Sequence, residues 1–281
     1  MNRTSLAEAE PRRLTSSAWN AVDHTADPNR FVSYLDAVTR QGAVQAYKQA
    51  SYALLGLNPG DRALDVGCGT GDDAEFLAGI VGPGGSVVGL DVSEEMVEES
   101  RRRQEGRGRS LEFQVGDAHR LHLEVEAFDG VRADRVLQHL NDPEQAVTEL
   151  IRVTRPGGRV VVADTDWGTL AIDSPHRGTT RAVLDGISAG IRNPWMGRQL
   201  YGLFGRAGLA DVSAVSFAPV VTDFNLAQHL AHIGDGIEQA VTAGTITVEA
   251  GERWSQGLAK AGEAGQFFGT VTISVVSGRR P

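Results

Sequence analysis

The stretch LDVGCGTGDD, residues 64–73, contains the residues whose spacing best suggests chemistry. Glycines alternate at Gly67, Gly69 and Gly71, between an apolar strand-like run at 63–66 and a helix-like run at 74–81. A tight glycine turn lets a ligand approach bare backbone, and the helix N-terminus behind it offers unpaired N–H groups. This order of strand, glycine turn and helix is typical of the first unit of a nucleotide-binding α/β sheet.

The glycine spacing narrows the class of ligand. A dinucleotide-binding loop has glycines in the pattern G-x-G-x-x-G, but here the third glycine comes one residue early and Asp72 stands in the last place. A helix N-terminus usually favours anions, but here a pyrophosphate would face the carboxylates of Asp72 and Asp73, which would repel it. No Gly-Lys-Ser/Thr follows, so a P-loop is excluded. The loop therefore predicts a ligand without phosphates.

A second acid fits such a ligand. Asp91 follows the strand-like run at 86–90 and lies about 20 residues beyond the glycine turn. An acidic side chain at this place can accept hydrogen bonds from both hydroxyls of a ribose.

Several motifs together, in this order and spacing, resemble those of class I S-adenosylmethionine-dependent methyltransferases: Asp65-x-Gly67-x-Gly69-x-Gly71, Asp91 and Gly116-Asp117-Ala118. The resemblance covers residues 43–209 and the last strand, and the nearest subgroup acts in quinone and small natural-product biosynthesis. It implies a Rossmann-like α/β fold, with a seven-stranded, mostly parallel sheet, helices on both faces, an antiparallel last strand and helical lid insertions. It also implies S-adenosyl-L-methionine as cofactor and S-adenosyl-L-homocysteine as product.

The resemblance assigns cofactor contacts residue by residue. Backbone at Gly67 and Gly69 admits the methionine and ribose parts, Asp91 holds the ribose hydroxyls, and Asp117 bonds the adenine amino group. The other expected contacts are Val92 and Met96 around the adenine ring, Gly116 and Ala118 beside Asp117, Asp65 on the loop or the methionine ammonium, and Gln138 after the fourth strand.

Methyl transfer from a sulfonium requires alignment of the reacting atoms, exclusion of water and, for some acceptors, removal of a proton. His139 is the first candidate base, because histidine titrates near neutrality and this one follows the fourth strand, at the sheet edge where ligands lie. His24 is the second candidate and Asp166 the third. A histidine that orders the loop or contacts only the cofactor is the alternative for His139.

Four aromatic residues are candidate walls of an acceptor pocket, because aromatic faces attract cations: Trp19, Tyr34, Trp167 and Trp195. Core packing explains any one of them equally well. In the resembling family, N-terminal segments such as the one with Trp19 and Tyr34 fold over cofactor and acceptor as a lid. The alternative is a helix packed on the surface of the domain.

The elements that must position these residues alternate along the chain. Strands are expected at 86–91, 111–115, 128–133 and 160–163, with helices after Ser93 and from Asp142-Pro143. Such alternation predicts a mostly parallel sheet with helices on both faces.

Beyond the fifth strand the pattern loosens. We expect insertions at 165–195 and 224–262, the second made of two helices, with a helix at 197–207 and a strand at 211–221 between them. Residues 267–276 predict a final antiparallel strand at the edge of the sheet. Residues 1–42 are expected to form an N-terminal arm with lid helices, and residues 43–281 a single methyltransferase domain.

Composition limits the partners and the compartment. A formal charge of −9 argues against a nucleic-acid substrate, which needs a basic face. The single cysteine, Cys68, rules out an internal disulfide and suits the cytoplasm, where the protein is expected. No apolar stretch is long enough to span a membrane, and the N-terminus lacks the apolar core of a signal peptide. A homo-oligomer is compatible with the sequence.

Neither a metal centre nor a nucleophilic serine is predicted. The pairs His119/His122 and His229/His232 have helical spacing but no obvious third ligand. No G-x-S-x-G motif occurs.

The leading hypothesis is methyl transfer to a small organic acceptor, a secondary metabolite or quinone-like molecule. The tryptophans and nearby acids favour carbon or nitrogen of an electron-rich, indole-like ring. The alternative is an S-adenosylmethionine-binding cyclase or scaffold of the same fold. A nicotinamide-dependent oxidoreductase conflicts with the glycine spacing, and for a non-catalytic interaction module the ribose and adenine acids give no reason.

Overall fold

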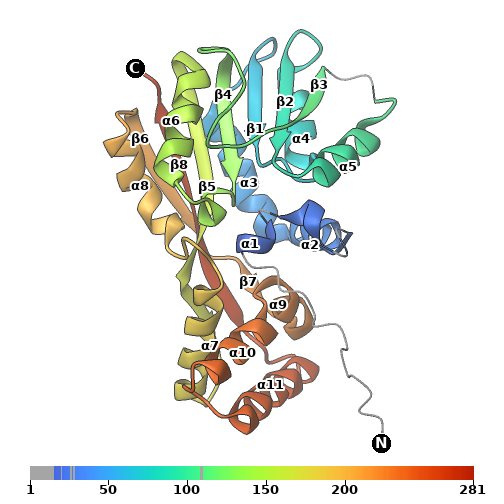
Figure 1. The fold of residues 1–281 in the computed structure, drawn as a ribbon, viewed down its shortest axis with the longest axis vertical. Helices are drawn as coiled ribbons and strands as arrows, with labels where there is room; N and C mark the ends of the chain where they lie inside the picture. Colours follow the sequence, from blue (N-terminus) through green and yellow to red (C-terminus); the bar gives the residue numbers. More distant parts are fainter. Residues whose placement is uncertain (1–15, 20, 26, 28, 108–109) are drawn as a thin grey trace, which may run out of the picture.

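The computed structural model describes residues 16–281 except 20, 26, 28, 108 and 109, so the N-terminal part of the predicted arm lies outside the described residues. One sheet runs through the molecule in the order β3-β2-β1-β4-β5-β8-β6, and a short β7 pairs with β8 (Figure 1). The strands are β1 Arg62–Val66, β2 Ser86–Asp91, β3 Leu111–Val115, β4 Phe128–Asp134, β5 Thr154–Ile172, β6 Ala210–Phe217, β7 Val220–Val221 and β8 Gly269–Arg279.

The pairing confirms the predicted fold class. Strands β3, β2, β1, β4 and β5 are parallel neighbours, and β8 runs antiparallel to both β5 and β6. Parallel strands need crossover connections, which α4, α5 and α6 provide from β1 to β2, from β2 to β3 and from β4 to β5, whereas β3 and β4 are joined without a helix.

The helices connect and flank these strands. They are α1 Ser16–Trp19, η1 Val22–His24, α2 Asn29–Thr39, α3 Gly42–Leu55, α4 Asp72–Val81, α5 Glu94–Gln104, η2 Leu137–His139, α6 Pro143–Val153, α7 Arg177–Ala189, α8 Met196–Arg206, α9 Phe224–Leu230, α10 Ile233–Thr242 and α11 Val248–Glu263. The expected starts of α5 and α6 are confirmed: Ser93 Oγ accepts from Met96 N, and Asp142 accepts from Gln145 N. None of the helices in the described part of the chain has the length and hydrophobicity to cross a bilayer.

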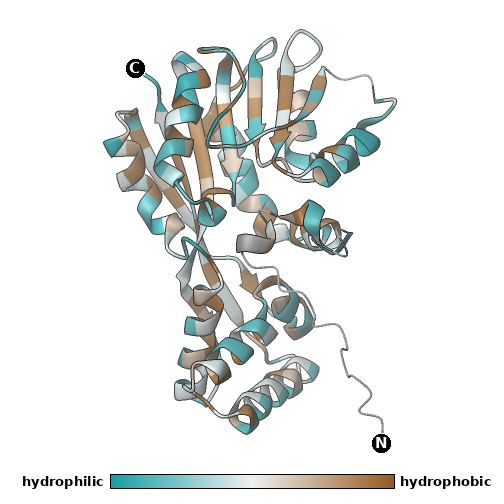
Figure 2. Ribbon diagram, in the orientation of Figure 1, coloured by the Kyte–Doolittle hydropathy of each residue, from teal (hydrophilic) through white to brown (hydrophobic). Residues whose placement is uncertain are grey.

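Alternating strand residues build two cores, one on each face of the sheet. Val161 and Ala163 of β5 pack with residues of α2, α3 and α4, whereas Val160 and Val162 pack with residues of α6 and α8. This period of two is the signature of a sheet covered on both sides. Figure 2 shows the strands as hydrophobic bands between helices whose outer faces are hydrophilic.

A third core lies in a separate helical lobe. Trp167 from β5, Phe224 from α9, Trp254 from α11 and Phe267 are buried together with residues of α7. In Figure 1 this lobe gathers α7, α9, α10 and α11 around the far ends of β5 and β8. The predicted boundary between an N-terminal segment at 1–42 and a domain at 43–281 stays a prediction.

The last two long strands differ from the expectation. The expected insertion at 165–195 begins as a strand, because β5 continues to Ile172 and stays paired with β8, with a register irregularity between Asp166 and Ala171. The final strand is antiparallel as expected, but its predicted edge position is wrong: β8 lies between β5 and β6, and β6 forms the edge. Strand order is set by tertiary pairing, which the pattern along one strand does not encode.

The second insertion and the strand before it also differ. Residues 224–262 form three helices, α9, α10 and α11, where two were expected. The expected strand at 211–221 is divided into β6 and β7 around Pro219, which has no N–H to donate to a ladder.

Candidate active site

The glycine turn joins β1 to α4 at the carboxyl end of the sheet and lines one end of a cavity of about 320 Å³. Gly67 and Gly69 have φ of 70° and 52°, in the left-handed region that favours glycine. A Cβ at Gly67 would lie 2.3 Å from Cγ2 of Val136, and one at Gly69 would lie 2.8 Å from Cδ1 of Leu35. The two positions therefore need glycine both for conformation and for space.

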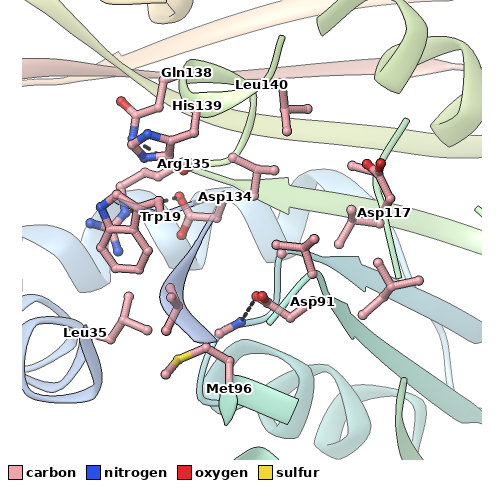
Figure 3. A pocket seen from close by; sticks show the side chains of 18 of the residues that line it. Trp19, Leu35, Asp91, Met96, Asp117, Asp134, Arg135, Gln138, His139 and Leu140 are labelled. Carbon is pink, nitrogen blue, oxygen red and sulfur yellow. Dashed lines mark hydrogen bonds and ion pairs between the residues drawn. The ribbon is translucent and has the colours of Figure 1, made fainter. Parts of the chain in front are cut away.

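Asp91, at the end of β2, is bound to this turn and lines the same cavity. Its Oδ2 accepts from Gly69 N at 2.9 Å and its Oδ1 from Ser93 N at 3.0 Å. Burial raises the pKa of Asp91, while the backbone hydrogen bonds from Ser93 and Gly69 act in the opposite direction. The carboxylate is thus held in place by backbone donors beside the turn (Figure 3).

Asp117 follows β3 and contributes to the other side of the same end, with Gly116 and Ala118 beside it. Its Oδ1 accepts from the backbone N of His119 at 2.9 Å and lies 2.6 Å from His119 Nδ1. Partial burial raises the pKa of Asp117, but the bonds from His119 outweigh it and the pKa is lowered. Val92 and Met96 also line this end, and their predicted contact with an adenine ring stays a prediction.

Asp65 lies below the cavity and does not line it. Its Oδ1 is 3.1 Å from Arg132 Nη1. Burial is the main cause that raises the pKa of Asp65, to about 7. Arg132 is completely buried and also contacts Asp73 and Asp134, each at 3.0 Å. Asp65 therefore belongs to a buried ionic network under the turn, which fits the loop-anchor role better than contact with a ligand.

The opposite end of the cavity is aromatic. Trp19, Tyr34, Gln138, His139 and Trp167 line it, and the Trp19 ring lies 5.9 Å from that of His139 and 5.6 Å from that of Tyr34. In Figure 3 Trp19, Gln138 and His139 lie on one side of the cavity and Asp117 on the other. The structure thus brings together three of the four residues expected to form an acceptor wall.

Gln138 is engaged with this aromatic end. Its Oε1 accepts from Trp167 Nε1 at 2.8 Å, and its Nε2 lies 3.1 Å from His139 Nε2. Burial, with the charge of Arg135 next in size, lowers the pKa of His139 to about 3. His139 is therefore neutral at neutral pH and is a weak proton acceptor.

Three predicted residues lie elsewhere. His24 is exposed on η1, outside the cavity lining. Asp166 binds Arg198 at 2.5 Å (Nε to Oδ2) and 2.7 Å (Nη2 to Oδ1), and Trp195 is 52% exposed with the Arg198 guanidinium over its ring. Asp166, Trp195 and Arg198 form a cluster away from the cavity, because successive residues of a strand face opposite sides: Thr165 and Trp167 of β5 line the cavities, whereas Asp166 between them does not.

A second cavity of about 240 Å³ adjoins the first, and both are lined by Tyr34, Arg135, Gln138 and Trp167. Its other walls are largely apolar and come from α3, α9, β7 and β8, among them Val44, Val221, Leu230, Phe267 and Ile273. The two cavities together can hold a ligand at the glycine turn and a second, apolar molecule beyond the aromatic end.

The motifs assigned no role to Asp134, Arg135 and His232, which also line the first cavity. Asp134 is the last residue of β4 and Arg135 follows it, so their position at the sheet edge was a usable signal. His232 comes from the start of α10, and its ring stacks on Tyr34 at 5.5 Å. Nothing in the sequence indicated that α10 would reach this cavity. No cluster of three metal-ligating side chains occurs within the described residues.

Comparisons with known proteins agree with this geometry. The family described as "Methyltransferase domain" matches residues 64–162. An uncharacterised 37.1 kDa protein of transposon Tn4556 from Streptomyces fradiae is 43% identical over 249 residues, which cover 87% of this chain and 70% of that protein.

Two further proteins are similar over different extents. The demethylmenaquinone methyltransferase of Bacillus cereus is 35% identical over 127 residues, which cover 45% of this chain and 54% of that enzyme, so the chain spans about half the length of such relatives. The YcgJ protein of Bacillus subtilis has a similar fold, with a TM-score of 0.60 at 19% identity over 84% of this chain and 99% of that one.

Proposed function

Because this chain belongs to the class I S-adenosylmethionine-dependent methyltransferases, and S-adenosylmethionine is its cofactor, we propose that it methylates a small organic acceptor bound in the second cavity. One observation carries the proposal. A cavity with two acids and a bare glycine turn at one end shares the residues of its aromatic end with a second and largely apolar cavity. The second space suits a mid-sized organic molecule rather than a macromolecule.

The residues at the turn fit the cofactor. Asp91 would hold the ribose hydroxyls, Asp117 would bond the adenine amino group, and Val92 and Met96 would flank the ring, while the backbone at Gly67 would lie against the methionine part. When bound, S-adenosylmethionine supplies a methyl group already activated on a sulfonium. The chain contributes alignment of the acceptor and exclusion of water, which together lower the barrier by about 7 to 11 kcal/mol in favourable cases.

Trp19 and Tyr34 cover the aromatic end and would exclude water from the reacting atoms. Their ring faces also attract positive charge, which suits a site that holds a sulfonium. We propose His139 as the group nearest the acceptor's proton, and we propose no proton-transfer role for His24 or Asp166, because neither lines the cavity. The favoured acceptor atom is a carbon or nitrogen of an electron-rich ring.

The test is incubation of the protein with methyl-labelled S-adenosylmethionine and three small acceptor classes: hydroquinones, phenols and indoles. Label in one of these products supports the proposal, and Asp91→Ala should reduce it together with the cofactor affinity measured by calorimetry. Cofactor binding with rearranged but unlabelled product would identify a cyclase, and cofactor binding with no reaction on any acceptor would indicate a scaffold. Absence of cofactor binding would contradict the proposal entirely.

A further inference from the structure

Arg135 lies where the two cavities adjoin, and none of the proposed cofactor contacts involves it. It lines both cavities, and its side chain is only 15% exposed. Its φ is 57°, a left-handed conformation that is uncommon for a residue with a side chain. The backbone is held there by a hydrogen bond from Arg135 N to Ala163 O at 2.8 Å. Strained residues of this kind cluster at functional sites.

The buried acids nearby are neutralised by other cations. Asp73 and Asp134 are the two neighbouring carboxyls whose pKa is lowered, and each contacts both Lys48 and Arg132 within 3.1 Å. Arg135 is farther away, with 3.9 Å from its Nε to Asp134 Oδ1. It is therefore a third cation beside two ionised carboxylates.

The other titratable groups that face Arg135 do not supply another negative charge at neutral pH. They are Asp164, whose pKa is raised well above its usual range by burial, Tyr34 and Tyr47, whose pKa values are raised by burial, and His139, which is neutral. Among the described residues, Arg135 Nε is buried and has no hydrogen-bond acceptor, while the Arg135 side chain also hydrogen-bonds Tyr34. A buried cation with incomplete hydrogen bonding is costly, so an anionic group on a ligand would be favoured at the part of the side chain that lines the two cavities.

We propose that Arg135 binds an acidic hydroxyl oxygen of the methyl acceptor, a phenol or enol, in its anionic form, while the apolar remainder of that molecule fills the second cavity. This inference rests on the proposed function and narrows its acceptor class. A guanidinium is suited to the task because it stays protonated and offers several donors in a fixed plane. The remaining walls of the cavity provide apolar contact.

Binding of the anion would also make a general base beside the acceptor's hydroxyl unnecessary, which agrees with the low pKa of His139. The acceptor's hydroxyl proton goes to solvent when the anion binds, so no protein group has to remove it during the reaction. The anion then forms one bond to the methyl carbon while the carbon–sulfur bond breaks and its electron pair stays on sulfur. If the new bond is to a ring carbon, the proton on that carbon leaves to solvent afterwards and the ring regains its aromatic form.

The test uses umbelliferone, a small phenol whose neutral and anionic forms have different absorption spectra, and coumarin, which lacks the hydroxyl. Each is titrated into the whole protein, with and without S-adenosylhomocysteine, at a pH where free umbelliferone is mostly neutral. We expect binding to shift umbelliferone toward its anionic spectrum, and coumarin to bind more weakly by about tenfold or more.

Variants connect the shift to Arg135. Arg135→Gln should lose the spectral shift and bind umbelliferone about 10- to 100-fold more weakly, with coumarin binding unchanged. Arg135→Lys keeps the charge and should retain part of the shift, which a merely structural role would not explain. Arg181→Gln, at an exposed pair on α7, is the matched control and should behave as the wild type.

The outcomes separate this inference from the proposed function. If the wild type binds S-adenosylhomocysteine but leaves the spectrum of bound umbelliferone neutral, or binds umbelliferone no better than coumarin, the Arg135 inference is wrong and methyl transfer stands. Equal spectral shifts in the wild type and Arg135→Gln would also overturn it. If the shift depends on Arg135 but S-adenosylhomocysteine does not bind, the anion site stands and the proposed function fails.

Discussion

The two ends of the main cavity are built by different means. The end at the glycine turn, where we propose that the cofactor binds and which we call the cofactor end, comes from one stretch of sequence, residues 66–118, in which each strand ends next to the residue that it presents. The aromatic end, which we propose faces the acceptor and which we call the acceptor end, collects Trp19 from α1, Tyr34 from α2, Gln138 from η2, Trp167 from β5 and His232 from the start of α10. Local backbone geometry defines the first end, and long-range packing defines the second.

This difference has a consequence for mutation. Backbone donors fix Asp91, so damage at the cofactor end should be confined to cofactor binding. The acceptor end depends on side chains that pack on one another, so changes there should alter the acceptor and leave the cofactor bound. The buried ionic network lies beneath both and should affect the whole fold.

The largest effect is expected from Arg132→Met, which removes the cation shared by Asp65, Asp73 and Asp134. Lys48 still contacts Asp73 and Asp134 in this variant, but Asp65 loses its cation partner, and breaking a buried ion pair by removing one member destabilises a protein by about 3 to 5 kcal/mol. Urea unfolding should therefore show a much lower midpoint. Arg181→Met, at an exposed pair, is the control and should change the free energy of unfolding by less than about 0.5 kcal/mol.

The second-largest effect is expected from Gly67→Ala. Alanine would have to adopt a positive φ, and its Cβ would lie 2.3 Å from Cγ2 of Val136. Left-handed strain and overpacking together cost about 2 to 4 kcal/mol. Calorimetry with S-adenosylhomocysteine should show reduced affinity, and thermal unfolding should show reduced stability. The control is Gly178→Ala in α7, where no atom lies within 4 Å of the new methyl group. Wild-type affinity of Gly67→Ala for S-adenosylhomocysteine would mean that the glycine turn is not part of the cofactor-binding site.

Asp91→Ala should weaken cofactor binding by about 10- to 100-fold, since a charge-assisted acceptor is worth about 1.5 to 3 kcal/mol. Asp91→Asn keeps one oxygen and should give an intermediate loss. Umbelliferone binding, measured in the same samples, should stay within a factor of two or so of the wild type. A parallel loss of both ligands would break the distinction between the two ends.

Gln138→Leu tests the acceptor end and removes the hydrogen-bond acceptor of Trp167 Nε1. A buried donor without a partner costs about 1 to 3 kcal/mol, which should appear in thermal unfolding and in weaker umbelliferone binding. Cofactor affinity should be unchanged. An equally large loss of cofactor affinity would instead support the contact that the sequence motif predicted for Gln138. Gln228→Leu, on the exposed side of α9, is the control.

The smallest effect at neutral pH is expected from the double variant His139→Gln, His232→Gln. Burial lowers the pKa values of these histidines to about 3 and about 4, from an ordinary 6.5. At a pH between these lowered pKa values and 6.5, the two histidines bind more protons in the unfolded chain than in the native one. Their contribution to the free energy of unfolding is therefore fully present above pH 6.5 and is lost as the pH falls.

The double variant should therefore lose stability less steeply than the wild type between pH 6.5 and pH 4, measured by urea unfolding at a series of pH values. His24→Gln, at an exposed position, should keep the wild-type slope. The same slope in all three proteins would show that the buried histidines do not carry this pH dependence.

The comparison also explains what the sequence could predict. Glycine spacing and strand-end acids are local signals, so Gly67, Asp91 and Asp117 could be assigned from the order of residues alone, and they lie together at one end of the cavity. Trp195 and Asp166 could not be placed, because residues 165–172 were not recognised as part of β5, whose alternation turns Trp167 to the cavity and Asp166 away from it. The role of His232 depends on where α10 packs. Likewise β8 could be recognised as a strand, but its place between β5 and β6 is a property of the assembled sheet.

The length of β5 and β8 has one more consequence. The pair runs from Arg159 and Arg279 at one end to Ile172 and Gly269 at the other, with a register irregularity between Asp166 and Ala171, and so carries both the sheet and the helical lobe. Because the same two strands pair on both sides of this irregularity, we expect the span from the glycine turn to the far wall of the second cavity to be set by strand rise. We expect the enzyme to select acceptors by length, methylating shorter homologues of its acceptor and rejecting longer ones.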